Sequence, residues 1–364
     1  VPGTRDLRVQ RSIDLIGTLT LTGGIFCLVL AILQGNGWSW MSGPTLGLFG
    51  GALGCLVIFV IVELVQKNPL VDFSLFKSMT FSGTNLTMFL FGAAIQGAFL
   101  MIILYFTNAR GYSGLEATYG LAPFPIASFV ISILVGQLSN RMNPHIVGMV
   151  GSALISAGFV LLCFIDADTS YIDIAWRTVL LGAGMGMLFQ CLPTIALLHV
   201  PRAKLGVGSG VFDTGRQIGF ALGVAILVSV FTSNLAPNLN QARQRAIQMV
   251  RQDQKLPAPM RDQIAQQLEK VDLSSSHRGS NTNANQGSNL VKLADQLPPQ
   301  TSAEQKTAIR TELKGIGNQI GHLFTNGVVD AFKAAWLVAA IVAAMSFVSA
   351  LITLLSTVTR SFRK

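Results

Sequence analysis

LGVGSGVFDTGRQIGFALGVAILVSVF, residues 205–231, is the stretch that decides the fold, because it is apolar over the length of a bilayer and still carries two charges. A helix of about 20 apolar residues spans the hydrocarbon core of a membrane. Asp213 and Arg216 lie three residues apart within it, at a depth where charged side chains are costly. We therefore interpret the stretch as a transmembrane helix whose two charged side chains have a task.

The rest of the chain is apolar in the same way. Of its 364 residues, 51% are hydrophobic and only 12% are charged, whereas a soluble protein carries about 25% charged residues. Eight segments are long and apolar enough to span a bilayer, without the alternation of β-barrel strands: residues 13–33, 44–64, 80–106, 116–138, 145–165, 174–199, 206–232 and 331–357. The sequence predicts an all-α polytopic membrane protein with eight transmembrane helices.

The charges in the short loops predict the orientation of these helices. Lys and Arg gather in alternate loops, and the positive-inside rule places those loops in the cytoplasm. The aromatic residues with polar tips fall at or near the opposite side, as in an outer aromatic belt: Trp38, Trp40, Trp176, Trp336, Tyr105, Tyr112, Tyr119 and Tyr171. We expect a multi-pass protein of the plasma (inner) membrane with both ends of this chain in the cytoplasm. The net charge of +9 is scattered over loops, which argues against nucleic-acid binding.

Four units follow from this pattern. Residues 1–78 hold two linker helices and a cytoplasmic connector, and residues 79–232 hold five helices of a six-helix bundle. Residues 233–330 form an extracytoplasmic polar loop, parts of which are weakly amphipathic. Residues 331–364 hold the last helix and a basic tail. The loop is interpreted either as a solvated hairpin without chemistry or as a docking surface for an extracytoplasmic adaptor.

The charged residues of the seventh segment lie on one helical face, because Asp213, Arg216 and Gln217 are three and four residues apart. Beside them runs a stripe of small residues that lets another helix approach closely: Gly215, Gly219 and Gly223. Asp213 lies about 12 Å into the helix at about 1.5 Å per residue. Two interpretations remain open: a structural ion pair, and a carboxylate that takes up and releases a proton.

Other polar residues lie within the apolar segments. Asn85, Gln96 and Gln190 either make interhelical hydrogen bonds or line a substrate path. GAGMGMLFQCLP, residues 182–193, combines three glycines with Pro193, so we expect bending there. Asp14 and Glu63 lie near cytoplasmic edges, and we interpret both as wetted interface residues.

Several stretches together resemble the 14-helix drug:proton antiporters of the major facilitator superfamily, the EmrB/QacA type. LHVPRAKLGVGSGVFDTGRQIGFALGVAI (198–226) is similar to that family's hallmark turn and helix. GYSGLEATYGLAPFP (111–125) and NPLVDFSLFKS (68–78) resemble two further segments. GQLSNRMNP (136–144), with Gly136, Asn140 and Arg141, resembles the superfamily's cytoplasmic loop motif, in which Asn140 stands where Asp is common.

The resemblance implies that the eight helices correspond to helices 7–14 of that fold. The first two would be the extra pair between the halves, and six further helices would precede this chain. Asp213 stands where that family more often has Asn, so it is either a proton or cation site specific to this protein or the partner of Arg216; it is our candidate for proton coupling, with Arg216 beside it. Asn85, Gln96, Gln190 and Gln217 would line the path of the substrate.

These features predict proton-coupled efflux of small amphipathic compounds, in which two bundles rock about a site near the midplane. One alternative is a dedicated transporter of a metabolite, toxin or siderophore. Another is a non-transporting membrane receptor or scaffold. We find no nucleophile–base pair, phosphate loop, metal-ligand cluster or cofactor signature, so we predict no enzyme activity, no cofactor and no metal.

Overall fold

The computed structural model describes residues 14–66, 70–138, 141–198, 200–270 and 303–361, and these residues are helical apart from short connections. Eight helical stretches are long and apolar enough to cross a membrane, as the sequence predicts. The fourth span consists of two helices that adjoin at Leu121 and Ala122. The α-helices are α1 (Leu15–Trp38), α2 (Gly43–Val65), α3 (Met79–Asn108), α4 (Gly114–Gly120), α5 (Pro123–Leu138), α6 (Pro144–Leu162), α7 (Tyr171–Leu197), α8 (Leu205–Gln252), α9 (Ala258–Glu269) and α11 (Ala303–Ser361).

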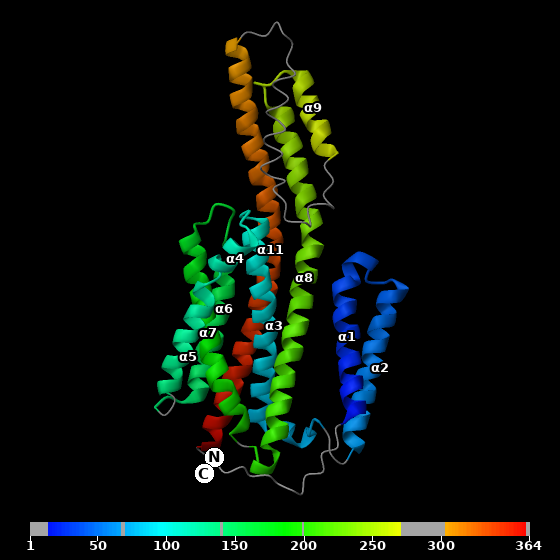
Figure 1. Cartoon of the computed structure of the whole chain (residues 1–364), viewed down its shortest axis with the longest axis vertical. Helices are drawn as coiled ribbons and strands as arrows, with labels where there is room; N and C mark the ends of the chain where they lie inside the picture. Colours follow the sequence, from blue (N-terminus) through cyan, green and yellow to red (C-terminus); the bar gives the residue numbers. More distant parts are fainter. Residues whose placement is uncertain (1–13, 67–69, 139–140, 199, 271–302, 362–364) are drawn as a thin grey trace.

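The helices form a bundle with a separate hairpin beside it (Figure 1). Within the bundle, α3 packs against α8 and α11, and α7 packs against α5 and α6. The hairpin of α1 and α2 contacts the bundle through α8. Two short 3₁₀ turns, η1 (Phe73–Lys77) and η2 (Arg202–Lys204), precede α3 and α8.

Short polar residues set where several helices begin. The side chains of Ser42, Ser78, Asn143 and Ser170 accept backbone N–H groups at the starts of α2, α3, α6 and α7. Such caps satisfy donors that have no partner within the helix. Asn143 is therefore the cap of α6.

The contact between α3 and α8 is a backbone-to-backbone packing. Gly219 and Gly223 are buried, and a methyl group added to either would overlap the backbone of Phe89 or Ala93 in α3. Gly215 is different, since the nearest neighbouring atom lies 3.9 Å from such a methyl group. Two glycines of the predicted stripe thus bring the helices together, and the third lines the pocket between α8 and α3, where a methyl group would make an ordinary contact with Asn85.

The connector between α2 and α3 is joined to the turn before α8 by charge. Nζ of Lys204 lies 2.5 Å from Oδ2 of Asp72 and donates to Oγ of Ser74 at 3.0 Å. The backbone N–H of Ser74 donates to Oδ1 of the same Asp72. Next to this contact Leu75 packs with Phe81 and Val211. These contacts join the connector to the first turns of α3 and α8.

Two residues that the sequence places in an aromatic belt are core residues instead. Tyr105 and Trp336 are each 1% exposed. Their rings lie 5.5 Å apart, and Phe332 packs on both. They join α3 to α11. An aromatic residue near a membrane edge faces either lipid or a neighbouring helix, and sequence position does not distinguish the two.

The segment 233–330, parts of which are weakly amphipathic, contains helices on both sides of its polar middle. Helix α8 continues without interruption to Gln252, and α11 begins at Ala303, well before residue 331. With α9 they form an extension beyond the end of the bundle (Figure 1). Its core consists of small and apolar side chains at helical spacing: Leu239, Ala242, Ala246, Val250, Ile264, Leu268, Leu313, Ile316 and Ile320. The polar middle of the segment, residues 271–302, lies outside the described residues.

We predict that Gly223→Ala destabilises the protein by about 1–3 kcal/mol, the usual cost of overpacking, because the α3 backbone must move. The matched control is Gly215→Ala, whose methyl group overlaps no neighbouring atom and which gains up to about 1 kcal/mol of helix propensity. Thermal unfolding in detergent measures both. Equal midpoints for the two variants would contradict the packing role.

We predict a second, acid-sensitive contribution from the connector. The hydrogen bonds from Lys204 and Ser74 lower the pKa of Asp72 from 3.8 to about 2. A lowered folded-state pKa gives stability that is present above the unfolded value and is lost as pH falls toward the folded one. Asp72→Asn should therefore cost about 1 kcal/mol at neutral pH, and the difference from wild type should shrink between about pH 4 and 2. Asp262→Asn, on the exposed side of α9, is the control and should show no such pattern.

Candidate functional site

Asp213 and Arg216 form an ion pair within the membrane-spanning part of α8. Nη2 of Arg216 lies 3.0 Å from Oδ1 of Asp213, one turn away on the same helix. The pair sits on the face that the spacing predicts. The distance is that of a structural ion pair. Exchange of a proton requires in addition that the carboxyl group be accessible, so the exposure of each partner matters.

The two partners differ in exposure. The Arg216 side chain is 23% exposed and its Nε is buried without a hydrogen-bond partner. The Asp213 side chain is 58% exposed, and Gln217 beside it is exposed as well. Among the described residues, nothing covers this carboxylate. The guanidinium of Arg216 is thus largely enclosed by the bundle, whereas the carboxylate of Asp213 is accessible from outside the bundle.

Aromatic rings hold the arginine. Its guanidinium carbon lies 5.5 Å from the ring centre of Phe189 in α7 and 5.9 Å from that of Phe220 in α8. Phe189 in turn makes an edge contact with Phe91 of α3 at 5.7 Å. Cation–π contacts of this kind fix an arginine without neutralising it. Sequence reasoning missed these rings, although Phe220 lies four residues after Arg216, the spacing at which helical side chains meet.

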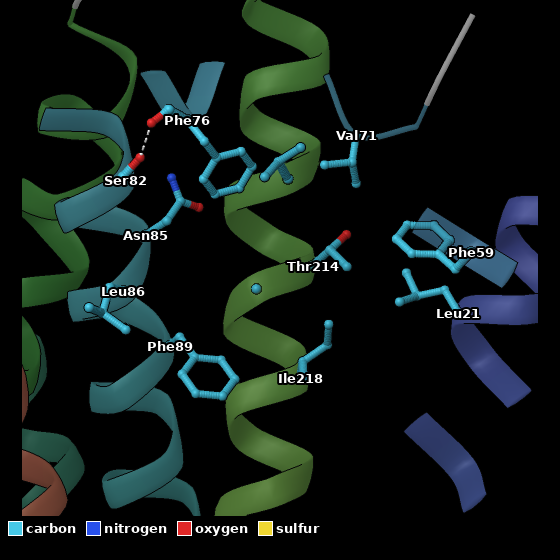
Figure 2. A pocket seen from close by; sticks show the side chains of 12 residues that line it. Leu21, Phe59, Val71, Phe76, Ser82, Asn85, Leu86, Phe89, Thr214 and Ile218 are labelled. Atoms are coloured by element: carbon cyan, nitrogen blue, oxygen red, sulfur yellow. Dashed lines mark hydrogen bonds between the residues drawn. The ribbon is translucent and has the colours of Figure 1, made fainter. Parts of the chain in front are cut away.

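A pocket lies on the other side of α8, between the bundle and the hairpin of α1 and α2. Its volume is about 320 Å³, and apolar side chains dominate its lining. Figure 2 shows Leu21 and Phe59 facing it from the hairpin, and Asn85 and Phe89 facing it from α3. Thr214 and Ile218 of α8 complete the wall (Figure 2). The pocket is suited to an apolar group with few hydrogen-bonding atoms.

The predicted path residues do not converge on one cavity within the described residues. Asn85 is buried, donates to the carbonyl of Phe81 at 2.8 Å, and lines the pocket beside the hairpin. Gln96 and Gln190 are exposed on α3 and α7. Nε2 of Gln190 lies 3.4 Å from the position of a methyl group on Gly136. The pocket and the Arg216 contact with α7 therefore belong to different sides of α8.

In the cytoplasmic loop motif Arg141 closes a turn, and the glycines of α7 pack against neighbouring helices. Arg141 is exposed and its backbone N–H closes the turn after α5, while Asn140 lies outside the described residues. α7 is one continuous helix with Pro193 inside it. Gly182, Gly184 and Gly186 lie directly against the backbones of α5 and α6. The three glycines that predicted bending therefore serve close packing.

Asp14 and Glu63 are buried, at 4% and 3% exposure, which corrects their interpretation as wetted interface residues. The sequence could not place them together, because they lie on different helices.

The described residues hold no cluster of three or more metal-ligating side chains. The four cysteines are free thiols.

Comparison with known proteins identifies the family. The family model described as Major Facilitator Superfamily matches residues 15–224. The multidrug resistance protein Stp of Mycobacterium tuberculosis is 29% identical over 238 residues, 65% of this chain and 44% of that protein. The multidrug transporter protein MdtP of Bacillus subtilis is 30% identical over 223 residues, 60% of this chain and 41% of that protein. The tetracenomycin C resistance and export protein of Streptomyces glaucescens is 26% identical, over 63% and 42% of the two chains.

A solved structure of a bacterial homolog of the human lysosomal transporter Spinster, inward-facing and occupied, aligns over 92% of this chain and 66% of that one, with 15% identity and a TM-score of 0.44. The chain spans less than half the length of the three curated relatives named above. Since the family model covers more than half of its residues, including α1 to α7 and the charged part of α8, the chain belongs to the Major Facilitator Superfamily, a family of membrane transporters.

Proposed function

We propose that the chain is the part corresponding to helices 7–14 of a proton-coupled transporter that exports small amphipathic compounds. The observation that carries the proposal is the ion pair of α8, in which the arginine is largely buried and the aspartate is exposed. Arg216 is fixed between Phe189 and Phe220, and Asp213 is exposed next to it inside a membrane span. Ionisable residues within spans commonly mark ion or substrate pathways.

The coupling follows from the charge of this pair. With Asp213 ionised the pair is neutral, and a proton on Asp213 leaves a net positive charge on Arg216. The arginine stays in place because the rings hold it, so protonation changes the charge presented to the open face by one unit. A cationic amphipathic compound and a proton would then compete for the same carboxylate, which is the simplest basis for exchange.

Support from relatives is consistent with this direction. Two of the relatives are named for multidrug resistance or transport, and a third for resistance to and export of tetracenomycin C. In transporters of this architecture the substrate site lies near the midplane between two bundles, which rock about it. The open face of α8 would be one wall of such a site.

Asp213→Asn in the full-length protein tests the coupling. We expect export driven by a pH gradient into everted vesicles to fall at least tenfold, because the amide cannot exchange a proton, while binding of a cationic dye to purified protein persists. Asp262→Asn, an acid outside the membrane spans, is the control. Unchanged gradient-driven export by Asp213→Asn would refute the coupling role.

Competition between unrelated dyes separates multidrug export from transport of one dedicated compound. If an open, weakly specific face binds the substrate, two cationic dyes of different shape should each inhibit transport of the other. Transport of a single compound that neither dye inhibits would instead favour a dedicated carrier. The measurement is the initial rate of dye accumulation in the same vesicles.

A further inference from the structure

The hairpin of α1 and α2 holds two buried acids that the proposed transport mechanism does not use. Asp14 precedes the first turn of α1 and Glu63 lies in the last turn of α2. The helices are antiparallel neighbours, so these two ends meet. A methyl group on Gly17 would lie 2.8 Å from Cγ of Asp14 and 2.9 Å from Oε1 of Glu63. Glycine at position 17 therefore leaves the space in which the two carboxyl groups meet.

The hydrogen bonds around the two acids are unequal. Oδ1 of Asp14 accepts the backbone N–H of Gly17 at 2.7 Å. With its amide nitrogen turned toward Asp14, Gln66 donates to both oxygens of that carboxyl group, at 3.1 and 2.8 Å. Oε2 of Glu63 accepts the backbone N–H of Val71 at 3.2 Å, but its Oε1 is buried and has no partner if both acids are ionised.

Helix polarity makes the two acids unequal as well. Asp14 stands at the positive N-terminal end of α1, which favours a negative charge, whereas Glu63 stands near the negative C-terminal end of α2, which disfavours one. Two carboxylates in contact away from water cannot both be ionised without a large cost. A proton on Oε1 of Glu63 removes the repulsion and supplies the hydrogen bond that this buried oxygen lacks.

No cation in the described residues offers a different solution. α1 contains no charged residue and α2 contains only Glu63. On the neighbouring connector and α8, Asp72 is paired with Lys204, and Asp213 with Arg216. Lys77 of η1 and Arg202 of η2 are exposed. Among the described residues, Asp14 is the charged side chain that the structure places beside Glu63 around Gly17.

We propose that Asp14 and Glu63 form a proton-binding site in the hairpin, with one proton held by Glu63 and donated to Asp14. The site is separate from Asp213, and it lies one helical turn from the pocket, since Glu63 follows Phe59 by four residues and Gly17 precedes Leu21 by four. Val71 belongs to both, because its backbone N–H bonds Glu63 and its side chain lines the pocket. Loss of the proton would place two like charges one helical turn from that pocket.

Infrared spectroscopy of the purified full-length protein in lipid tests the site directly, because a protonated carboxyl group has its own carbonyl stretch. Wild type at neutral pH should show a band that disappears in Glu63→Gln and in Asp14→Asn. In each variant the new amide donates a hydrogen bond to the remaining acid, which then ionises. Glu269→Gln, an exposed acid on α9, should leave the band unchanged. Absence of the band in wild type, or its persistence in both variants, would overturn the proposal.

The pH dependence of stability gives a second measurement on the same proteins. The native state keeps the proton at pH values at which the unfolded chain has already lost it, so this contribution to stability decreases as pH rises above about 4.3, the ordinary pKa of glutamate, until the native site also loses its proton. The unfolding midpoint of wild type should therefore fall over this range, whereas Glu63→Gln should lack this fall, because its amide mimics the protonated acid at every pH. Parallel curves for wild type and Glu63→Gln would contradict a shared proton.

Discussion

The backbone contact between α3 and α8 is the constraint on which the arrangement depends. Gly219 and Gly223 let α8 lie directly on Phe89 and Ala93, and no larger residue fits there. In lipid, helices associate through such close packing rather than through the hydrophobic effect. The contact fixes the rotation of α8, so that Arg216 faces α7 and Thr214 faces the hairpin. The position of the ion pair and the position of the pocket both follow from this one contact between α3 and α8.

The membrane spans are predictable from sequence because each one meets a single requirement, about 20 apolar residues in a row. The ends of α8 and α11 are not, because their extension is helical for a different reason. Beyond Phe231 the pattern changes from a continuous apolar run to apolar residues every three or four positions, such as Leu239, Ala242 and Ala246. An apolar span and a weakly amphipathic stretch follow each other here, and their spacing alone does not show that one helix runs through both. The packing partner of each face, supplied by α9 and α11, is tertiary information.

In the candidate site too, contacts within one helix are predictable from sequence, whereas contacts between helices are not. The pairing of Asp213 with Arg216 follows from their spacing on one helix, and the geometry agrees. The aromatic contacts of Arg216 with Phe189 and the separation of Asn85 from Gln190 depend on how α7 and α8 are rotated, which spacing within one helix does not determine. The burial of Glu63 was missed for a related reason. A position near the end of a span is equally compatible with water and with a neighbouring helix.

The two acidic sites differ in how their charge is balanced, and this difference separates what each can do. Asp213 has a guanidinium at 3.0 Å and an exposed carboxyl group, so its ionised form is balanced, and exchange of a proton or a cation at this carboxyl group is what we propose for it. Glu63 is 3% exposed, and its charged neighbour is another carboxyl group. Since no cation among the described residues pairs with it, we propose that a proton neutralises its charge. The ion pair of Asp213 therefore presents its carboxyl group to the exposed face of α8. The pair of Asp14 and Glu63 lies instead between the hairpin and the bundle, because Val71 contacts Glu63 with its backbone and lines the pocket between α1, α2, α3 and α8.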